Sequence, residues 1–415
     1  MRLSQSFTRT THGVPADEQS RNAKLLIKAG YIHKEMAGVY VLLPLGLRVI
    51  EKIKQIVREE MNAIDGQELQ MSSLQRKELW QKTDRWDDKE VDIWFKSKLR
   101  NGSEVGLAWS HEEPIVDMLK NFISSYRDLP VYVYQFQTKL RNEIRAKSGI
   151  LRTREFIMKD MYSLSRTADE HEAFYQRAIE AYHKVFKRIG IDDKTFFTFA
   201  SGGAFTQFSH EFQTLLASGE DTVYLDEIKK RAINAEVMSD EVASSLSLDK
   251  AKLEKVTVAE VGNIFNFGTT KAEQLGLQFS DKAGQKQPVF LGSYGIGITR
   301  LMGVVAELFA DDKGLVWPEA VAPYQVHLIA LSGSQAKKSA EALYDQLTTA
   351  GVEVIYDDRG DSAGKMFADA DLLGAPIRLV VSEKSLAAGG YEIKHRKQET
   401  AKIVPVDSIV DILRR

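Results

Sequence analysis

Two arginines stand where side chains could hold phosphate. Arg300 closes the segment Gly292-Ser-Tyr-Gly-Ile-Gly-Ile-Thr-Arg300, and Arg141 follows a segment, residues 131–140, that alternates like a strand. A guanidinium stays protonated and binds phosphate oxygens through two parallel hydrogen bonds. When an oxygen of a carboxylic acid attacks the α-phosphorus of ATP and pyrophosphate leaves, negative charge must be neutralised at two places. Two arginines and a glycine-rich strand therefore favour ATP chemistry, with Arg141 and Arg300 as the catalytic candidates.

The glycines of this segment fit the same chemistry. Gly295 and Gly297 lack side chains, so the strand can lie flat beneath a nucleotide, and a helix starting near Thr299 would point its amide groups at an anion. The spacing matches neither the dinucleotide fingerprint nor the P-loop, and tight strand-to-helix packing explains it equally well. Arg141 and Glu143 could likewise belong to surface ion pairs. Only the occurrence of the glycine segment together with the Arg141 cluster is specific.

The elements that must position these residues follow from hydrophobic periodicity. Residues 131–140 alternate at period two and predict a strand with one buried face, which places Arg141 at a strand end. Residues 151–161 predict the neighbouring antiparallel strand, and residues 167–189 a helix with an acidic first turn. Further elements are expected as helices at 23–29 and 45–61, and as strands at 195–200, 222–225 and 288–297.

The pattern changes after the proline-flanked segment Trp317–Pro323. Strands and helices then alternate, which predicts a compact α/β domain over residues 323–415. Its expected elements are 326–331, 334–350, 352–356, 362–373 and 377–381. Residues 226–255 are charged and rich in Ala and Ser, and they predict a short linker or helical patch.

Composition narrows the class of protein. A chain of 415 residues predicts two or three domains, and the 43% hydrophobic content excludes a disordered chain. The absence of cysteine excludes disulfides and thiolate chemistry and fits a reducing compartment. The net charge of −2 gives no sign of a nucleic-acid partner. We expect no membrane span, because charges interrupt the apolar segment 26–47, and no removable presequence, because acidic residues soon follow the basic start.

The arginine cluster and the glycine strand resemble motifs 2 and 3 of class II aminoacyl-tRNA synthetases, and the surrounding sequence is similar to prolyl-tRNA synthetases. The likeness covers nearly the whole chain. It is carried by Met1-Arg-Leu-Ser4, Leu43-Pro-Leu-Gly-Leu-Arg48, Leu79-Trp80, Ser110-His-Glu-Glu113, Tyr134-Gln-Phe-Gln-Thr-Lys139, Arg154-Glu-Phe-Ile-Met-Lys-Asp160, Ser209-His-Glu-Phe212, the glycine segment and Phe367-Ala-Asp-Ala-Asp-Leu-Leu-Gly374.

The resemblance implies a fold and an activity. The fold is a class II antiparallel β-sheet catalytic domain flanked by helices, formed by residues 1–225 and 256–320, with an anticodon-binding domain at 323–415. The activity is activation of L-proline with ATP to prolyl-adenylate, followed by transfer of the prolyl group to the 3′ end of tRNA(Pro). ATP and Mg²⁺ are the implied cofactors, and the protein ligands of the metal are not identified beyond Glu211 as a candidate.

The same resemblance assigns the ATP site. Arg141 would hold the α-phosphate and Arg300 the γ-phosphate, Glu143 would bind the adenine amino group, and Phe156 would stack on adenine. The remaining expected ATP-binding residues are Arg152, Gly295 and Gly297.

For proline, the family's Thr-x-Glu element matches Ser110-His111-Glu112, where a hydroxyl and a carboxylate can accept hydrogen bonds from a secondary ammonium. By themselves, Ser110 and Glu112 would more readily indicate a helix N-cap with an acidic first turn. His210 and Glu211 are further proline-binding candidates, with an internal polar pair as the alternative.

The expected partners are L-proline, tRNA(Pro) and a second copy of the chain, with neither DNA nor a membrane, in the cytoplasm. In the C-terminal domain Asp358, Arg359 and Lys365 are the anticodon candidates, since splayed single-stranded bases can be read on their edges by such side chains.

The chain departs from the family in two ways. Only residues 226–255 occupy the place where many bacterial relatives insert an editing domain that hydrolyses alanyl-tRNA, so we expect no such editing in cis. Ser72 stands where motif 1 usually has proline, Trp109-Ser110 replaces a usual Pro-Thr, and Asn263 stands where histidine is common.

Two other functions remain open at this stage. One is a non-catalytic RNA-binding relative, although such proteins typically lose the phosphate arginines, and Arg141, Arg152 and Arg300 are all present. The other is a synthetase for another small amino acid, of the threonyl or glycyl type, against which the Ser110 and Ser209 segments and the missing zinc ligands argue.

Overall fold

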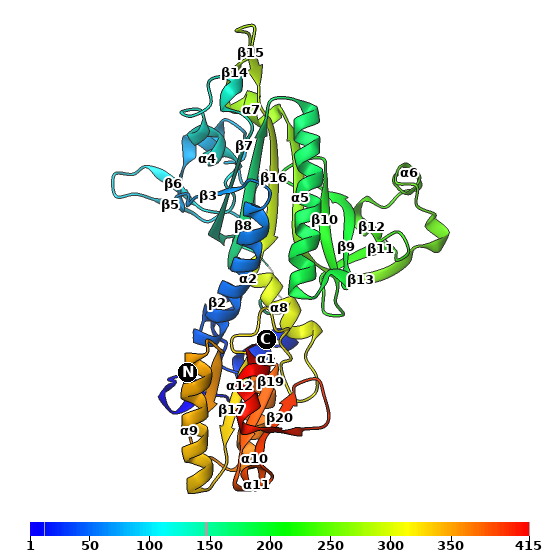
Figure 1. Ribbon diagram of the computed structural model, residues 1–415. Coiled ribbons are helices and arrows are strands. Elements are labelled where there is room, and N and C mark those ends of the chain that lie inside the picture. Colours follow the sequence, from blue (N-terminus) through cyan, green and yellow to red (C-terminus); the bar gives the residue numbers. More distant parts are fainter. Residues whose placement is uncertain (12, 145, 147, 415) are drawn as a thin grey trace. The chain divides into compact units, whose positions relative to one another are not determined.

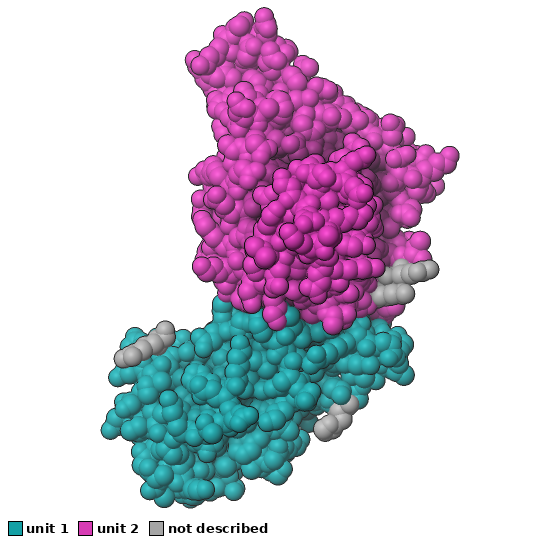
Figure 2. Space-filling model, turned by 90° about the vertical axis from the view of Figure 1, so that its right-hand side faces the viewer, with its two compact units in different colours: residues 1–35, 40–52, 305–415 teal, residues 36–39, 53–304 magenta. Residues whose placement is uncertain are grey.

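The computed structural model describes residues 1–11, 13–144, 146 and 148–414. The chain divides into two compact units (Figure 2). One, which we call the terminal unit, comprises residues 1–35, 40–52 and 305–415, and the other, the central unit, comprises residues 36–39 and 53–304. The chain passes between them within two strands, β1 (Ile32–Met36) and β2 (Val39–Leu42), and within two helices, α2 (Pro44–Asn62) and α8 (Ile298–Leu308).

A nine-stranded sheet forms the framework of the central unit (Figure 1). Most neighbouring strands run antiparallel, whereas β12 with β9 and β3 with β7 are parallel. In spatial order the strands are β10 (Phe208–Leu215), β9 (Thr195–Ser201), β12 (Arg231–Asn234), β11 (Asp221–Asp226), β13 (Glu254–Gly268), β16 (Phe290–Gly297), β8 (Glu155–Ser165), β7 (Val131–Leu140) and β3 (Gln67–Glu68).

The strands that carry the candidate residues lie next to one another in this sheet. Strand β7 has the bounds that alternation predicts, and Arg141 follows its last residue. Strand β8 begins at Glu155 rather than at 151, because the chain is still turning there and Gly149 adopts a positive φ of 63°. The register places Gly295 opposite Asp160 and Gly297 opposite Met158. The arginine cluster and the glycine strand are therefore neighbours.

Part of the sheet closes on itself. Strand β10 pairs with β9 on one side and with β13 on the other, so β10, β9, β12, β11 and β13 form a closed ring of pairings. Its interior holds a small apolar cluster that includes Phe196, Val223, Leu225 and Val258. Strand β12 belongs to residues 226–255, the expected linker. That segment thus contributes a strand to the sheet as well as the short helix α6 (Asp240–Ser245) and the 3-10 turns Ala235–Val237 and Lys250–Lys252.

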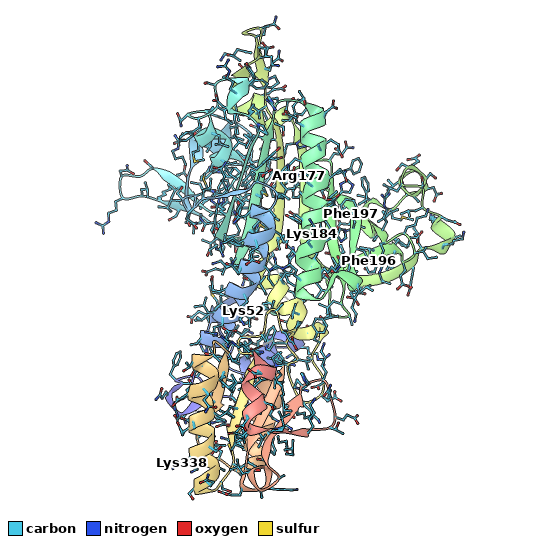
Figure 3. The ribbon with its side chains drawn as sticks, in the orientation of Figure 1. Lys52, Arg177, Lys184, Phe196, Phe197 and Lys338 are labelled. Atoms are coloured by element: carbon cyan, nitrogen blue, oxygen red, sulfur yellow. The ribbon has the colours of Figure 1, made fainter. Side chains whose placement is uncertain are left out.

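Helix α5 (Ala168–Ile189) packs on the sheet, as its periodicity predicts. Thr167 caps its N-terminus by accepting a hydrogen bond from the Glu170 amide, and Gly190 ends it in the left-handed conformation at φ 91°. The outward side carries Arg177 and Lys184 (Figure 3), and Arg177 pairs with Asp65 at 2.6 Å.

Smaller elements complete the central unit. A three-stranded sheet and two helices lie around a core rich in tryptophan. These elements are β4 (Leu74–Arg76), β6 (Glu104–Leu107), β5 (Lys96–Lys98), α3 (Lys77–Gln81) and α4 (Glu112–Leu119). The remaining elements are a hairpin of β14 (Gln278–Ser280) and β15 (Lys286–Pro288), helix α7 (Thr270–Leu275) and the 3-10 turns Tyr126–Asp128 and Asp192–Lys194.

The terminal unit contains the predicted C-terminal α/β fold. Its five-stranded sheet runs β18 (Val354–Asp357), β17 (Val326–Ala330), β19 (Ile377–Val381), β20 (Gly390–His395) and β21 (Lys402–Pro405), with the first three parallel. Its helices are α9 (Ser334–Thr349), α10 (Ala363–Leu373), α11 (Glu383–Ala387) and α12 (Ile409–Leu413), with the 3-10 turn Val406–Ser408.

N-terminal segments belong to this unit as well. They are the 3-10 turn Leu3–Gln5, helix α1 (Arg21–Lys28) and most of the two-stranded sheet β1 (Ile32–Met36) and β2 (Val39–Leu42). In the described part of the chain no helix has the length and apolarity needed to cross a membrane.

Candidate active site

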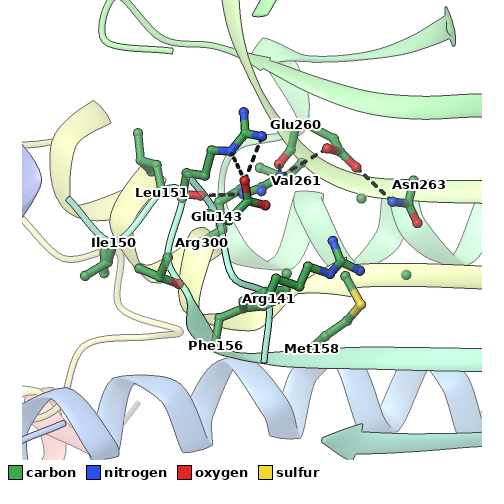
Figure 4. Close-up of a pocket in the computed structure, with 15 residues that line it drawn as sticks. Arg141, Glu143, Ile150, Leu151, Phe156, Met158, Glu260, Val261, Asn263 and Arg300 are labelled. Carbon is green, nitrogen blue, oxygen red and sulfur yellow. Dashed lines mark hydrogen bonds and ion pairs between the residues drawn. The ribbon is translucent and has the colours of Figure 1, made fainter. Parts of the chain in front are cut away.

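One pocket in the central unit collects all seven residues that the sequence nominates for ATP (Figure 4). They come from the end of β7, the turn before β8, β8 itself, β16 and the start of α8. The pocket is lined by Arg141, Glu143, Arg152, Phe156, Gly295, Gly297 and Arg300, together with Ile150, Leu151, Thr153, Met158, Glu260, Val261, Gly262 and Asn263. Residues that are up to 159 positions apart in the sequence therefore share one surface.

The guanidinium group of Arg141 lines this pocket and is held there by two contacts. Its Nε donates to the carbonyl oxygen of Trp109 at 3.3 Å, and its guanidinium carbon lies 5.3 Å from the centre of the Phe156 ring. Burial lowers the pKa of the Arg141 guanidinium, and the carboxylates of Glu143 and Glu260 oppose that shift. A half-buried guanidinium that lines a pocket favours the binding of an anion, because the anion offsets its lost hydration.

Arg300, the second candidate arginine of the pocket, is held by two backbone carbonyl oxygens. Its Nε donates to the carbonyl oxygen of Leu151 at 2.6 Å, and its Nη1 donates to the carbonyl oxygen of Glu260 at 2.6 Å. The Glu260 side chain also accepts from the Asn263 amide at 2.9 Å. Sequence reasoning missed Glu260, and the signal that could have found it is a carboxylate on the strand paired with the glycine strand.

Glu143 is paired with an arginine. Arg152 donates to its Oε2 from Nε at 3.1 Å and from Nη2 at 3.0 Å, and Arg152 Nη1 lies 3.3 Å from the Glu220 carboxylate. Burial opposes the charged form of Arg152, but the two carboxylates outweigh it and raise the pKa of Arg152. The two hydrogen bonds from Arg152 orient the Glu143 carboxylate at the pocket edge.

The two glycines leave room above the strand. A Cβ added at Gly295 would lie 2.6 Å from Asn263 Oδ1, and one added at Gly297 would lie 3.2 Å from the Cβ of Arg300. Helix α8 starts at Ile298, directly after the glycine strand, as expected. Thr299 Oγ1 accepts from the Ile157 amide at 3.0 Å and ties the start of the helix to β8.

Ser110 and Glu112 contact each other directly. The Ser110 hydroxyl donates to Glu112 Oε2, and the Ser293 hydroxyl donates to Oε1 at 3.1 Å. The side chain of Glu112 is only 3% exposed. The N-cap alternative for Ser110 is wrong: α4 has His111 at its N-cap position, with no capping hydrogen bond from a side chain, and the serine donates to a carboxylate instead.

His111 behaves as a structural residue behind Ser110 and Glu112. Burial and the neighbouring Lys139 lower the pKa of His111 to about 4, so the ring is neutral. Its Nδ1 accepts from Lys139 Nζ at 2.6 Å, which leaves Nε2–H to donate to the backbone oxygen of Ser72 at 3.1 Å. Because the contact uses the Ser72 backbone, the serine that replaces the family's proline does not alter this bond.

His210 and Glu211 point to opposite faces of β10. His210 accepts or donates a 2.6 Å hydrogen bond with the Tyr175 hydroxyl of α5, stacks on Phe197 and lines a different pocket. Glu211 lies on the side of Glu260, where burial and that second carboxylate raise the pKa of Glu211 to about 8. The expectation that both residues touch the same substrate does not fit this geometry, because neighbouring residues of a strand alternate faces. His210 pairs with Tyr175 instead, so the alternative of an internal polar pair between His210 and Glu211 does not fit this geometry either.

No protein-only metal site was found among the described residues. In that part of the chain no three His, Asp or Glu side chains are grouped so as to hold a metal ion. Asp221 resembles Glu211 in having its pKa raised, first by burial and then by Glu260. The acidic groups therefore lie close enough to repel one another.

The anticodon candidates of the terminal unit are all tied to neighbours. Arg359 donates to Asp357 at 2.9 and 2.7 Å and to Asp369 at 2.7 Å. The Asp358 carboxylate accepts from the amide and hydroxyl of Ser4 at 2.9 and 2.6 Å. Lys365, on the first turn of α10, pairs with Asp361, which precedes the helix. Lys365 remains half exposed, whereas Arg359 is largely buried.

Comparison with known families matches both parts of the chain. Residues 95–309 match the family described as tRNA synthetase class II core domain (G, H, P, S and T), and residues 325–415 match the anticodon binding domain. Among solved structures, prolyl-tRNA synthetase from Cryptosporidium parvum, complexed with halofuginone and AMPPNP, superposes with a TM-score of 0.77 at 18% identity, over 94% of this chain and 75% of that one. That likeness establishes the fold.

Curated relatives match over their full length. Proline–tRNA ligase of Agrobacterium fabrum is 36% identical over 99% of both chains, and that of Caulobacter vibrioides is 37% identical over 99% of this chain and 98% of its own. Proline–tRNA ligase of Burkholderia lata is 30% identical over an alignment of 565 positions. Because that alignment is longer than the 415 residues of this chain, the Burkholderia protein contains segments that are absent here.

Proposed function

Because this chain belongs to the proline–tRNA ligases, within the class II aminoacyl-tRNA synthetases, we propose that the pocket between β7, β8, β13 and β16 forms prolyl-adenylate. The protein is an ATP-dependent aminoacyl-tRNA ligase that activates L-proline and transfers it to the 3′ end of tRNA(Pro). The observation that carries the residue assignment is the single pocket that gathers both arginines and both glycines.

In this proposal ATP binds with its phosphates between the two arginines. Arg141 holds the α-phosphate, where the attacking carboxylate oxygen adds charge, and Arg300 holds the γ-phosphate of the leaving pyrophosphate. Phe156 and the flat surface over Gly295 support the adenine, and Glu143, oriented by Arg152, accepts from the adenine amino group. Both arginines keep their charge throughout, so no proton moves in the adenylation step.

Proline binds beside Glu112. Its secondary ammonium donates to the Glu112 carboxylate, which Ser110 and Ser293 hold in place by hydrogen bonds. A buried carboxylate that pairs with the ammonium favours an amino acid over a neutral ligand. In the transfer step a hydroxyl of the terminal ribose attacks the prolyl carbonyl, the bond from that carbonyl to the phosphate breaks, and AMP leaves. A phosphate oxygen of the adenylate accepts the hydroxyl proton, and positioning supplies the rate enhancement without a side-chain base.

The acidic groups near Arg300 suit a divalent cation that arrives with ATP. Mg²⁺ is usually bound by one or two carboxylates together with substrate phosphates, which agrees with the absence of a protein-only site among the described residues. Glu211 and Glu260 would hold it, and the raised pKa of Glu211 indicates a carboxyl group that lacks a cation partner. Such a cation would neutralise phosphate charge during pyrophosphate release.

We further propose the assembly and its partners. The α/β sheet of residues 323–415 binds the anticodon of tRNA(Pro), and residues 1–225 and 256–320 form the catalytic domain. We also propose a homodimer in the cytoplasm, on the strength of the family alone.

The test is amino-acid-dependent ATP–pyrophosphate exchange by the pure protein with proline, alanine, threonine, glycine and serine. Exchange with proline supports the proposal, and a weaker alanine signal is compatible with it. Exchange with none of the five, under conditions that keep the protein folded, would instead favour a non-catalytic relative.

A further inference from the structure

A cluster of buried charges lies directly against Glu112. Arg85 Nη1 is 2.9 Å from both oxygens of Glu113 and 3.5 Å from Glu112 Oε2. Lys271 Nζ is 3.0 Å from Glu113 Oε1, and Thr83 donates to the same oxygen at 2.9 Å. Glu113 is 0% exposed and Arg85 4%. Arg85 is the side chain of this cluster that touches both carboxylates.

The guanidinium of Arg85 is enclosed by aromatic rings. Its central carbon lies 4.5 Å from the centre of the Trp109 ring, 4.7 Å from Phe205 and 5.2 Å from Trp80. Arg85 Nε and Nη2 have no hydrogen-bond partner among the described residues, so the ring faces supply the compensation that a buried cation needs. Trp109 also accepts from Arg141 through its carbonyl oxygen. The tryptophan that replaces the family's proline thus lies between the two arginines.

Arg85 gives the cluster beside Glu112 an excess of positive charge. Glu113 faces two cations, Arg85 and Lys271, so this trio carries one net positive charge next to the Glu112 carboxylate. Burial alone would raise the pKa of the Glu113 carboxyl, but those two cations outweigh it and hold the pKa below its usual value. The other titratable groups that act on Glu112 are the cations of Lys139 and Arg141 and the neutral phenol of Tyr162.

We propose that Arg85 is a positioning residue for proline, which holds the Glu112 carboxylate beside a positive charge and in one orientation so that it can bind the ammonium of the substrate. This role rests on the proposed function, and it adds to it a residue that lies outside the proline-binding segment. Arg85 makes no contact with the reacting atoms, because it acts through Glu112 and Glu113.

Removal of the guanidinium makes the role measurable. In Arg85→Gln, Lys271 still pairs with Glu113, and Lys139 and Arg141 remain near Glu112, but the positive charge 3.5 Å from Glu112 Oε2 is gone, which makes it easier for this buried carboxylate to take up a proton. A protonated Glu112 cannot pair with the proline ammonium. We therefore expect the KM for proline to rise by about tenfold or more at neutral pH. Raising the pH should then lower that KM again, because it removes the proton from Glu112.

The experiment is pyrophosphate exchange by the full-length protein over a range of pH, with KM determined separately for proline and ATP. We expect Arg85→Gln to raise the KM for proline in a pH-dependent way while the KM for ATP changes less than about twofold, since the two substrates contact different groups. The double variant Arg85→Gln/Glu113→Gln loses one buried carboxylate together with one cation, so the charge balance beside Glu112 is restored; it should recover most of the proline affinity and lose the pH dependence. Arg85→Lys keeps the positive charge, so its KM for proline should lie between those of the wild type and Arg85→Gln.

Arg166→Gln is the matched control, because Arg166 also pairs with a glutamate, Glu170, but lies outside both substrate sites. It should leave both KM values unchanged. An unchanged proline KM in Arg85→Gln, an equal rise in both KM values, or a loss that Glu113→Gln does not rescue would overturn the proposal. If Arg85→Gln does not fold, the double variant and Arg85→Lys decide by the same criteria. Wild-type exchange with proline in the same assay separates failure of this inference from failure of the proposed function.

Discussion

Arg300 Nη1 binds Glu260 twice, at 2.6 Å to the backbone oxygen and at 3.2 Å to the carboxylate Oε2. The first contact fixes the arginine to strand β13, and the second places its positive charge beside an acidic group. Arg300 is therefore oriented before any phosphate arrives, and less conformational entropy is lost when a phosphate binds.

Arg300→Ala should abolish pyrophosphate exchange, with a loss of about 100-fold or more, because removal of a preorganised charge stabiliser has effects of that size. The side chain is partly exposed, so the fold should survive, which thermal unfolding can check. Arg300→Lys keeps a charge without the two-pronged geometry and should retain partial activity. Intact exchange in the alanine variant would contradict the assignment of the γ-phosphate to Arg300.

Gly295→Ala should weaken ATP binding. The new Cβ would lie 2.6 Å from Asn263 Oδ1, so the asparagine must shift, and its 2.9 Å hydrogen bond to Glu260 would be disturbed. We expect the KM for ATP to rise by about tenfold, since misplaced groups next to a reacting substrate have large effects. Gly364→Ala on helix α10 is the control: apart from the helix's own backbone and the adjacent residues, no described atom lies within 4 Å of the added Cβ, and a small gain in stability with no change in kinetics is expected. Equal kinetics for both variants would argue against a nucleotide over Gly295.

Stability should fall as the pH rises towards 8, because of Glu211. Burial and Glu260 raise the pKa of Glu211 to about 8, so the folded protein holds a proton that the unfolded chain releases near pH 4.5. The free energy of unfolding contributed by this group is full below pH 4.5 and declines as the pH rises through about 8. Glu211→Gln should remove this decline in urea titrations at a series of pH values. Glu241→Gln, on an exposed position of α6, should keep it, and parallel curves for wild type and Glu211→Gln would refute the explanation.

The pure chain should not hydrolyse alanyl-tRNA(Pro). Residues 226–255, where many bacterial relatives carry an editing domain, form only β12, α6 and short turns around a small apolar cluster. A proline pocket rejects alanine only through lost contacts, a discrimination of about 1–3 kcal/mol, so some mischarging is expected. Incubation of purified alanyl-tRNA with the enzyme, with prolyl-tRNA as the background control, measures this directly. Enzyme-dependent release of alanine above that background would show an editing activity elsewhere in the chain.

Lys365→Ala should weaken the use of tRNA without affecting proline activation. Lys365 is half exposed on the first turn of α10 and pairs only with Asp361 among the described residues. A lost lysine contact with phosphate should raise the KM for tRNA a few-fold and reduce its salt dependence, whereas pyrophosphate exchange stays normal. Lys338→Ala, on the exposed side of α9 (Figure 3), is the control and should change neither. A similar effect of both variants would indicate a nonspecific loss of charge.

Local pattern was sufficient for the elements that carry the ATP site. Alternation predicted β7 with its bounds, and the glycine segment predicted the β16 strand and the helix that follows it. The phosphate-binding chemistry of Arg141 and Arg300 could also be inferred, because the arginine cluster and the glycine segment are specific when they occur together, although each alone has a structural explanation. The start of β8 was missed by four residues, since a turn and a strand look alike until the partner strand is known.

What the sequence determined by itself is therefore most of the elements, the residues that turn out to share one pocket, and the family resemblance, all of which depend on short-range patterns and residue chemistry. Only the tertiary structure decided which faces and neighbours these residues have. It put His210 and Glu211 on opposite sides of β10, made Ser110 a donor to Glu112, and brought Arg85, Glu113 and Lys271 into one buried cluster. Such contacts join residues far apart in the chain, and the pairing of buried charges depends on packing that no local pattern records.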